Sequence, residues 1–584
     1  MERQIKECQN CKKEFIVEPE DFVFYEKIKV PPPTWCSNCR MVRRMVFANE
    51  RHLFKRKEDA YGKEVFSGYH PQVLARVYER DYWLGDKWDP MEYGRDYDFS
   101  RSFLKQFREL MYVVPWPSRD VTELVNSDYC NFTGWAKNCY LCFDAGFLEN
   151  CAYVVSGDKI KECFDVTEAE DSELCFESLF IEKCYRTFFS THCEECRDVW
   201  FSRDCVGCSY CLGCVNLRNK QYHIFNKPYT QETYFQELEK LGPGSYKSLQ
   251  DIAKKADNFW ILQPHKFMHG WRNVGVSGDQ ISHSKNAKLC FNAFELEDSK
   301  NCQNNFMKSR DLYDVTAMGG CELVYESVQV GLEVAGLKFA WLCWPSINNV
   351  EYSMFCNSSS NLFGCVGLRK KSHCIFNKQY SPEDYLTLRE KIIKHMNEMP
   401  YTDSGGLVYK YGEFFPPEFS PFAYNETLAY DYFPLDQKSA KERGYLWREP
   451  GIKDFKVTVE TLSLPDKIKD VSDTIVQEII RCADCGGVFR IIPMELEFYK
   501  KMSLPLPRRC IECRYQARLK YRNQPWFYNR QCQCSGIKDD QGIYKNQTTH
   551  FHGTNHCPNE FETSYAPERP EIVYCEACYN NEVI

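Results

Sequence analysis

The sequence predicts a mainly β, multidomain protein in which two parallel β-solenoid domains lie between small zinc modules at both ends of the chain. The chain has 584 residues, more than one hydrophobic core usually serves, and 33 cysteines that gather in four separate groups. Two central segments match each other, and so do the two ends of the chain. Within the central segments the cysteines recur at steps that are multiples of three, between strand-like alternating stretches.

Each end of the chain carries two CxxC pairs, and the two ends have the same spacing between their pairs. A CxxC pair directs two thiolates at one ion, and four thiolates complete a tetrahedral structural zinc site. Residues 15–28 are predicted to form a short β-hairpin after the first pair, and the second pair is predicted to begin a helix. The two sets match at a constant offset of 474, and their predicted zinc ligands are Cys8, Cys11, Cys36 and Cys39, then Cys482, Cys485, Cys510 and Cys513.

The terminal pattern CxxC-x(3)-F, then FY, then P-x-P-x-x-C-x-x-C-R resembles a zinc-binding treble-clef domain, a small module of many bacterial proteins of unknown function. The wider layout, with such modules flanking duplicated cysteine-rich solenoid repeats, is similar to an uncharacterised bacterial family. The resemblance implies bound zinc, and it implies no particular activity or partner.

A third zinc site is predicted near the C-terminus, as a zinc ribbon. The alternative uses Cys557 with a histidine in place of one cysteine of the CxC pair, and His552 and His556 are further candidate ligands. With this site we expect about three zinc ions per chain. The ligands of the leading choice are Cys532, Cys534, Cys575 and Cys578.

The N-terminal half carries a copy of this ribbon that lacks its cysteines. Residues 69–83 match 565–579 at an offset of 496, with Glu79 and Tyr82 where the later copy has cysteine. We therefore expect a metal-free ribbon in which aromatic side chains replace the ion. The following segment contains FLKQFRELMYVVP, predicted as a short amphipathic helix that ends before Pro115.

The central repeats are predicted to be β-solenoids with cysteines facing inward. In the first repeat, cysteines recur at 139, 151, 163, 175, 184, 196, 205 and 214, in steps of 12, 12, 12, 9, 12, 9 and 9. Cysteine suits a solenoid interior because it is small, apolar and readily buried. A step of 12 makes either one full narrow coil or one side of a wider coil. Helices that begin after Thr230 and Ser381 are expected to cap the repeats.

Two functional interpretations of the repeats, an iron–sulfur site and an enzyme, are alternatives to a purely structural role. Cys205, Cys208, Cys211 and Cys214 have the spacing of iron–sulfur ligands, but only two of the four recur in the second repeat. A β-helix enzyme would place several carboxylates on one face, and those of the first repeat do not recur as one constellation. The sequence has no nucleophile elbow, phosphate loop, dinucleotide fingerprint or HExxH motif, so we expect a non-enzymatic protein with no evident small-molecule substrate.

The terminal modules are basic. Residues 1–57 hold 13 Lys and Arg against 8 Asp and Glu, and residues 481–530 hold 11 against 4. Basic groups with interleaved aromatic rings can bind phosphates and stack on unpaired bases, so RNA or a ribonucleoprotein is the first partner class predicted. A solvated helix face and a protein-binding surface are the alternatives. The candidate contacts are Arg40, Arg43, Arg44, Arg514, Arg518 and Arg522.

The predicted function is zinc-dependent binding of RNA or a ribonucleoprotein. The alternatives are a protein–protein assembly scaffold without nucleic acid, and a β-helix enzyme or iron–sulfur protein. No apolar run is long enough to span a membrane, and free cysteines in such number favour the cytoplasm. The predicted domains are a treble-clef zinc module, 1–57; a metal-free ribbon, aromatic linker and short helix, 58–125; the first solenoid repeat with its capping helix, 126–240; a linker, 241–276; the second solenoid repeat with its capping helix, 277–396; an aromatic, Pro-rich extended arm, 397–475; a second treble-clef zinc module, 476–530; and a zinc ribbon, 531–584.

Overall fold

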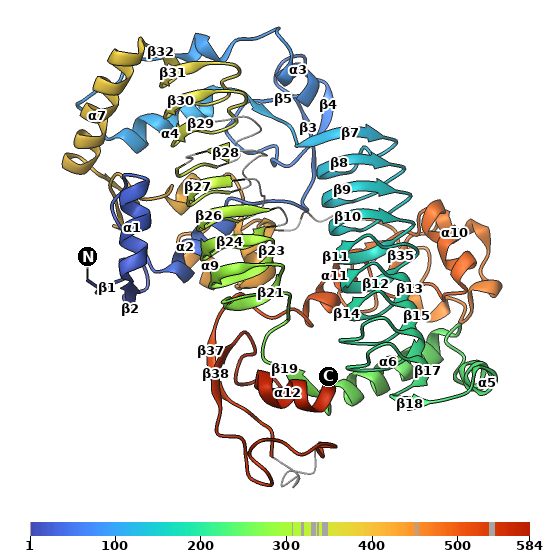
Figure 1. Ribbon diagram of the computed structural model, residues 1–584. Coiled ribbons are helices and arrows are strands. Elements are labelled where there is room, and N and C mark those ends of the chain that lie inside the picture. The colour runs from blue at the N-terminus through green and yellow to red at the C-terminus, as the bar shows by residue number, and fades with distance from the viewer. Residues whose placement is uncertain are drawn as a thin grey trace. The chain divides into compact units, whose positions relative to one another are not determined.

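The chain forms two compact units, each built from separated stretches of sequence. The computed structural model in Figure 1 describes residues 2–305, 308–316, 321–328, 334–335, 338–341, 348–449, 451, 455–535 and 544–584. The first unit holds Met1–Arg119, Met268–Glu449 and Gln524–Trp526, and the second holds Asp120–Phe267, Pro450–Asn523 and Phe527–Ile584. The N-terminal cysteine module therefore shares a unit with the second repeat, and the C-terminal modules share a unit with the first repeat.

The first repeat forms a large parallel sheet in which each residue pairs with one whose number is higher by 12 (Figure 1). Asn131 pairs with Phe143, Phe143 with Val155, and Val155 with Thr167. The last pairing alone is antiparallel. The strands are β7 (Val121–Val125), β8 (Asn131–Lys137), β9 (Phe143–Glu149), β10 (Val155–Lys161), β11 (Phe164–Glu170), β12 (Phe176–Glu182), β13 (Tyr185–Phe188), β14 (Thr191–Glu194), β15 (Arg197–Trp200), β16 (Ser209–Leu212), β17 (Gln221–Ile224) and β18 (Lys227–Pro228).

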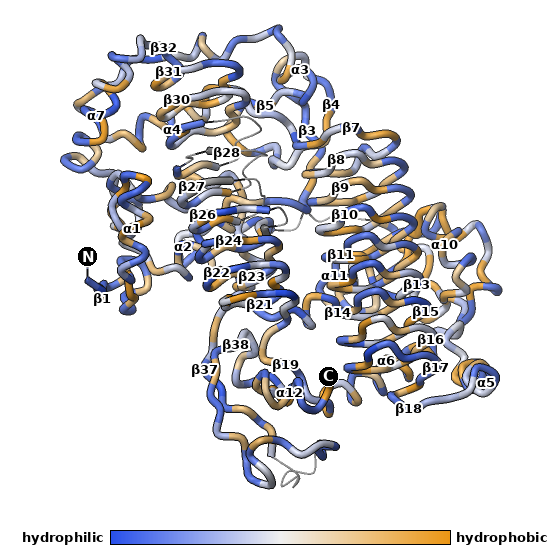
Figure 2. Tube along the Cα trace, viewed as in Figure 1, coloured by the Kyte–Doolittle hydropathy of each residue, from blue (hydrophilic) through white to orange (hydrophobic). Residues whose placement is uncertain are grey.

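A left-handed residue recurs at every third position along most of this sheet. Asn138, Leu141 and Asp144, for example, have φ angles of 53°, 51° and 51°. Cys139 and Cys142, which follow Asn138 and Leu141, face the interior. All residues of the interior cluster between Cys130 and Cys214 occupy this one position in three. Hydrophobic and hydrophilic residues consequently alternate over short distances along the strands (Figure 2).

The second repeat has the same parallel arrangement, but its pairing step is less regular. The step is 13 residues instead of 12 at three places. They are the pairings of Leu296 with Ser309, of Cys321 with Val334, and of Ala335 with Asn348. The step is shorter by one at the start, between β20 and β21. The strands are β20 (Gly270–Trp271), β21 (Gly278–Ser282), β22 (Lys285–Lys288), β23 (Cys290–Phe294), β24 (Leu296–Lys300), β25 (Gln303–Asn305), β26 (Ser309–Tyr313), β27 (Cys321–Tyr325), β28 (Val334–Ala335), β29 (Asn348–Glu351), β30 (Ser360–Phe363), β31 (Ser372–Ile375) and β32 (Lys378–Gln379).

Helices follow both repeats at the predicted positions. Helix α5 (Gln231–Leu241) begins after Thr230, and α7 (Pro382–Glu398) begins after Ser381. Each of these two hydroxyls accepts a hydrogen bond from a backbone N–H in the first turn, which confirms the predicted N-caps. The amphipathic helix before Pro115 is also confirmed, as α4 (Phe103–Val113). Within the described residues no helix is long and apolar enough to cross a membrane.

The terminal modules differ from their prediction in one element. Strands β1 (Gln4–Glu7) and β2 (Glu14–Val17) flank the first CxxC pair, and residues 19–27 form helix α1 (Pro19–Lys27) instead of part of a hairpin. Pro19 at the first helical position and acidic residues in the first turn favour this helix. The other helix of the module is α2 (Ser37–Met45), and the C-terminal copy has β35 (Ile480–Arg481), β36 (Val488–Phe489), α10 (Pro493–Met502) and α11 (Ile511–Leu519).

A β-hairpin follows each terminal module, and the two hairpins are duplicates. Strand β3 (Phe54–Lys57) pairs with β4 (Glu64–Ser67), and β37 (Tyr528–Gln531) pairs with β38 (Glu560–Thr563). The offset between the copies is 474 for the first strands and 496 for the second, so the later hairpin has the longer loop. The remaining elements are β5 (Val77–Tyr78), α3 (Arg80–Leu84), η1 (Pro90–Tyr93), β6 (Trp116–Pro117), α6 (Tyr246–Ile261), β19 (Pro264–Lys266), β33 (Tyr401–Thr402), β34 (Val408–Tyr409), η2 (Pro417–Phe419), η3 (Tyr424–Glu426), α8 (Leu428–Tyr432), α9 (Gln437–Glu442), η4 (Thr461–Ser463), η5 (Ile468–Asp470), η6 (Asp473–Gln477), β39 (Ile572–Tyr574) and α12 (Glu576–Val583).

Candidate metal centres

The four cysteines of the N-terminal module converge on one point. Their sulfur atoms all lie within 4.8 Å of one another, and the Sγ atoms of Cys11 and Cys36 are 3.8 Å apart. Cys36 is the N-cap of α2, and its backbone N–H donates to the Sγ of Cys8 at 3.2 Å. The start of the helix thus directs both an N–H group and a positive dipole end at the cluster, which favours thiolates.

The C-terminal copy reproduces this geometry. The Sγ atoms of Cys485 and Cys510 are 3.8 Å apart, and those of Cys482 and Cys513 are 3.7 Å apart. Cys510 is the N-cap of α11 and donates its N–H to the Sγ of Cys482 at 3.2 Å. Burial acts to raise the pKa of Cys482, but the N–H groups of Cys485 and Cys510 and another nearby lower it to about 7.

These sulfur–sulfur distances fit a tetrahedral ion. Bonds of about 2.3 Å from a central zinc to four sulfurs give tetrahedron edges of about 3.8 Å. A disulfide would instead place two sulfurs about 2.05 Å apart. Both clusters can therefore hold a metal ion such as zinc, as the CxxC spacing predicts.

The third cluster differs in one ligand from the leading prediction. It consists of Cys532, Cys557, Cys575 and Cys578, which are all buried. Cys557 thus takes the place expected for Cys534, and its Sγ is 3.9 Å from that of Cys575. Cys575 is the N-cap of α12 and donates its N–H to the Sγ of Cys532 at 3.2 Å, as in the other two clusters. Hydrogen bonding from Cys578, opposed by burial, lowers the pKa of Cys532 to about 6.

Cys534 belongs to a neighbouring group that includes two histidines. Its candidate ligand atoms, together with those of His550, His552 and Cys578, lie within 4.8 Å of one another. His552 therefore lies at a cluster, as the alternative prediction allowed. His556 is exposed and belongs to neither group among the described residues.

The N-terminal hairpin has a carboxylate where the later hairpin has its first cysteine. Glu58 stands 474 positions before Cys532, and its carboxylate accepts backbone N–H bonds from Ala60 and Tyr61 at 2.7 Å each. Glu79 caps α3 by accepting from the N–H of Tyr82. In place of an ion, aromatic rings pack here, and the contacting pairs are Tyr61 with Tyr82, Tyr78 with Tyr82, Tyr78 with Trp88, and Trp83 with Trp88.

The cysteines of the first repeat are buried in its core and bond to the backbone. The thiol of Cys205 donates to the carbonyl of Arg203 or Cys214, and that of Cys211 to the carbonyl of Ser209. Burial raises the pKa of Cys163 and Cys205 well above the ordinary value of a thiol, whereas hydrogen bonds from neighbouring thiols lower the pKa of Cys193 to about 5. Among the described residues, no potential metal group includes any cysteine between 205 and 214.

The arginines predicted to contact nucleic acid are used inside the units. In the first unit Arg40 forms an ion pair with Asp314, with 2.7 Å between the Arg40 nitrogen and the Asp314 oxygen. A guanidinium nitrogen of Arg44 is 3.5 Å from the other carboxylate oxygen of Asp314. The Nε–H of Arg44 donates to the Thr316 hydroxyl at 3.3 Å. Arg43 bonds to Glu326 and to another glutamate, Glu413.

The second unit repeats this arrangement with residues at the duplicated positions. Arg514 lies 2.9 Å from one oxygen of Asp165, and Arg518 lies 3.3 Å from the other. The Nε of Arg518 donates to the hydroxyl of Thr167 at 3.3 Å. We call each set of two arginines, one aspartate and one threonine a docking clamp. The clamps are Arg40, Arg44, Asp314 and Thr316, and Arg514, Arg518, Asp165 and Thr167.

An aromatic stack accompanies each docking clamp. The ring centroids of Phe24 and Tyr313 are 3.8 Å apart, and those of Phe498 and Phe164 are 4.4 Å apart. The arginines at 40, 43, 44, 514 and 518 are 0–4% exposed, so a phosphate could reach them only by displacing a buried carboxylate. Arg522 is half-buried. The placement of these residues therefore does not support the predicted nucleic-acid contacts.

The carboxylates of the clamps were not among the predicted site residues. Asp165 and Asp314 lie in FDVT and YDVT, which are duplicated at an offset of 149, while their arginine partners are duplicated at 474. Two duplicated motifs, one acidic and one basic, are a signal from which these contacts could have been inferred.

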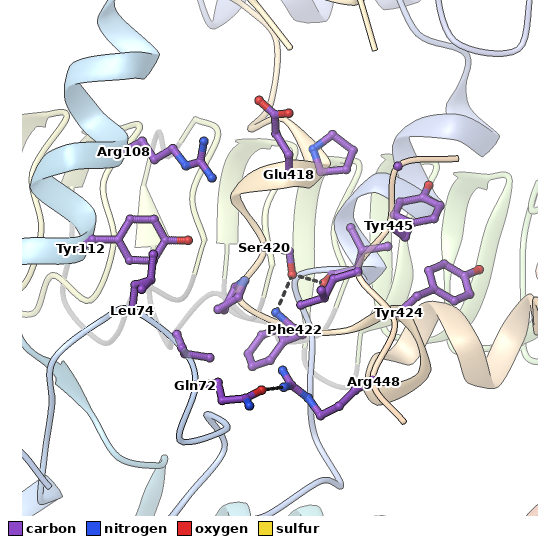
Figure 3. A pocket seen from close by; sticks show the side chains of 16 residues that line it. Gln72, Leu74, Arg108, Tyr112, Glu418, Ser420, Phe422, Tyr424, Tyr445 and Arg448 are labelled. Carbon is purple, nitrogen blue, oxygen red and sulfur yellow. Dashed lines mark hydrogen bonds between the residues drawn. The ribbon is translucent and has the colours of Figure 1, made fainter. Parts of the chain in front are cut away.

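One surface pocket of about 550 Å³ lies in the first unit (Figure 3). Arg108 and Tyr112 of α4 line one side, and Phe422 and Tyr445 line another. Arg448 donates to Gln72 at 3.3 Å and also pairs with Glu426. The charge of Arg448 is thus neutralised within the unit, and the pocket is a weaker candidate site than the cysteine clusters.

A comparison with models of protein families gives no match, and a search of curated proteins finds no significant match.

Proposed function

We propose that the protein is a non-enzymatic scaffold stabilised by zinc. In this proposal each repeat is a parallel β-solenoid whose coil is one pairing step long, supported by the recurring pairing offset and the left-handed residue at every third position. The terminal modules are treble clefs and the C-terminal module is a zinc ribbon, supported by N-cap cysteines and sulfur spacings that fit tetrahedral zinc.

The docking clamps carry this proposal. Each clamp anchors a cysteine module to a repeat through ion pairs whose side chains are 0–5% exposed. A buried arginine–carboxylate pair is costly unless both charges are satisfied, so such pairs specify one arrangement of the parts. The basic helices thus serve as anchors for the modules, and zinc keeps each anchor folded.

The partner we propose is a protein with a basic segment. The first repeat has a line of carboxylates at one register position of successive strands, where Asp158 pairs with Glu170, Glu170 with Glu182, and Glu182 with Glu194. Neighbouring strands are about 4.8 Å apart, so these like charges repel. Burial and the neighbouring Glu182 raise the pKa of Glu170. We call these four residues the acidic line.

Another register position of the first repeat gives a useful contrast. There Lys137 pairs with Glu149 and Glu149 pairs with Lys161, so that opposite charges alternate. The matching residues of the second repeat, Lys285, Glu297 and Arg310, alternate in the same way. In the acidic line, Lys159 lies 3.3 Å from Asp158 and Lys183 lies 2.6 Å from Glu182. A basic segment laid along the line would place further cations beside all four carboxylates.

The test compares peptide and RNA binding by the full chain. Fluorescence anisotropy with an oligolysine peptide is expected to show binding that weakens as salt is added. Replacing Glu170, Glu182 and Glu194 by glutamine is expected to weaken binding at least tenfold. The matched control replaces Glu232, Glu237 and Glu239 of α5, which changes the net charge of the same unit equally and should weaken binding much less.

Equal loss in the two triple variants would reduce the effect to net charge and reject the acidic line as the binding surface. Salt-dependent binding of an RNA pool, with no binding of the peptide, would favour the RNA hypothesis instead. The metal content of the same preparations tests the zinc part of the proposal separately.

A further inference from the structure

The loop of the later hairpin brings a second set of metal-ligating atoms beside the third cysteine cluster. The Nδ1 of His550 lies 3.1 Å from the Sγ of Cys534, and the Nε2 of His552 lies 3.4 Å from the same sulfur. The Nε2 of His552 is also 3.3 Å from the Sγ of Cys578. Two imidazole nitrogens and two sulfurs therefore converge on one point.

Both imidazoles are oriented as metal ligands usually are. The Nε2–H of His550 donates to the Glu582 carboxylate at 3.1 Å, and the Nδ1–H of His552 donates to the carbonyl of Asn555 at 2.7 Å. In each ring the nitrogen that carries the proton faces an acceptor, so the nitrogen with the lone pair faces the sulfurs. Histidines that bind metals are held in this way by a carboxylate or a backbone carbonyl.

The supporting groups are themselves fixed. The side chain of Glu582 is fully buried, and its carboxylate accepts hydrogen bonds from the Tyr544 hydroxyl at 2.9 Å and the backbone N–H of Gln547 at 2.6 Å. Asn546 donates from Nδ2 to the Sγ of Cys534 at 3.0 Å, which favours the thiolate form of that cysteine. The Tyr574 hydroxyl donates to the Asn546 oxygen at 2.7 Å and so points the amide nitrogen toward the sulfur.

Most of these ligands are absent from the duplicated hairpin. Cys534, His550 and His552 lie in the later loop, which spans 532–559, whereas the loop of the earlier hairpin spans only 58–63. The earlier loop is closed by Glu58 alone, through backbone hydrogen bonds. The longer loop is not needed to form a hairpin, and its added residues supply both histidines.

We propose that Cys534, His550, His552 and Cys578 bind a second metal ion beside the one held by Cys532, Cys557, Cys575 and Cys578, so that the Cys578 thiolate bridges the two ions. Two cysteines and two histidines suit zinc, a tetrahedral ion with no redox chemistry. Two bonds of about 2.3 Å that meet at a tetrahedral sulfur place the ions about 3.8 Å apart. The C-terminal module is then a two-metal centre with seven protein ligands.

This inference rests on the proposal that zinc fills the three four-cysteine clusters, and metal analysis separates the two. The full chain, purified without added chelator, is expected to contain four zinc ions. His550→Ala and His552→Ala are each expected to contain three. Cys485→Ser is also expected to contain three, because it removes the ion of a separate cluster and leaves the two-metal centre filled.

His556→Ala is the matched control, because it removes a histidine of the same loop that belongs to neither group. It should keep four ions. Glu582→Gln tests the positioning role, since loss of such a carboxylate typically weakens metal binding 10- to 100-fold. Competition with a chromophoric chelator should show one weakened ion in this variant and three unchanged ions.

Cadmium NMR tests the bridge. A chain loaded with ¹¹³Cd is expected to give four signals, two of them split by coupling through the Cys578 sulfur, and His550→Ala should remove one of the pair and the splitting. A chain with three zinc ions, and the same three in both histidine variants, would overturn the proposal and leave a thiol–imidazole hydrogen-bonded cluster. Four uncoupled signals would overturn the bridge, and a chain without zinc would overturn the proposed function as well.

Discussion

His265 in the second unit is a buried side chain that folding keeps neutral. It is 1% exposed, and its Nε2–H donates to the carbonyl of Trp260 at 2.9 Å. Among the described residues no group bonds to its Nδ1. Burial, together with the positive charge of Arg203, lowers its pKa to about 4, while Asp204 and Glu571 oppose the shift. This histidine therefore packs as a neutral residue inside the second unit.

The lowered pKa predicts that the second unit loses stability in mild acid. Below about pH 6.5 the unfolded chain binds a proton at His265 and the folded chain does not, so the free energy of unfolding falls until about pH 4. The contribution of this residue is about 3 kcal/mol over that range. Urea unfolding at several pH values should show a shallower pH dependence for His265→Gln. An unchanged slope would show that other groups cause the dependence.

At the scale of the element, the left-handed residue at every third position determines which side chains of the repeats face the core. An L-residue in this conformation costs about 1–2 kcal/mol unless it is glycine or a residue such as Asn or Asp. In the first repeat many left-handed residues are of other types, and Leu141 and Phe147 are examples. The cost is offset because each turn of the backbone places the next side chain in the core and aligns the strands for parallel pairing.

Substitutions at such a position should depend on backbone shape more than on side-chain contacts. Asp171 is exposed and has a φ of 46°. Asp171→Ile is expected to destabilise the second unit by about 1 kcal/mol, and Asp171→Gly should have little effect. The control is Lys161→Ile, at an exposed strand position where a β-branched residue is favoured. Thermal unfolding measures all three, and equal losses in the two isoleucine variants would contradict the expectation.

Part of this element could be predicted from the sequence. Cysteine steps that are multiples of three identify the inward position, because small apolar residues repeat there. The left-handed positions could not be predicted, since residues as different as Asn138, Leu141 and Lys159 occupy them. The cysteines alone do not reveal that every third residue faces inward. Some inward positions hold other residues, such as Ala136 and Leu148, and only the structure identifies these.

The same limit applies to the metal sites and their surroundings. CxxC pairs identify their own ligands, since their close spacing determines the local geometry. The contact of Cys557 with Cys575 depends instead on how a long loop closes, which spacing does not encode. The partners of Arg40 and Arg514 are far away in the sequence and lie on other elements, so spacing does not identify them, and the only sequence signal is that FDVT and YDVT are duplicated.

At the scale of the whole molecule, duplication has produced two units held by the same contacts. Each unit joins a cysteine module to the repeat from the other half of the sequence, so neither half of the chain contains a complete unit. Asp314→Ala should destabilise the first unit and Asp165→Ala the second, each by about 3–5 kcal/mol, because two buried arginines lose the carboxylate that they share. Calorimetry should show a different part of the unfolding profile shifting in each variant.

Glu64→Ala is the control for this pair of variants. Its side chain is 66% exposed and its carboxylate lies 3.3 Å from Lys55, so its loss should cost less than about 1 kcal/mol. If both clamp variants shifted the same part of the profile equally, the two units would unfold as one, and the assignment of one clamp to each unit would lose its thermodynamic support.

The three longer steps of the second repeat affect how such a chain can change in length. Each added residue moves the inward position by one, from the series of Cys302 to that of Leu312, then to that of Ala340, and back to the original series at Val350. A single added residue would place outward-facing side chains at the inward positions of every later strand. Three added residues return the original residues to the inward positions. We therefore expect this repeat to tolerate insertions or deletions whose total is a multiple of three residues.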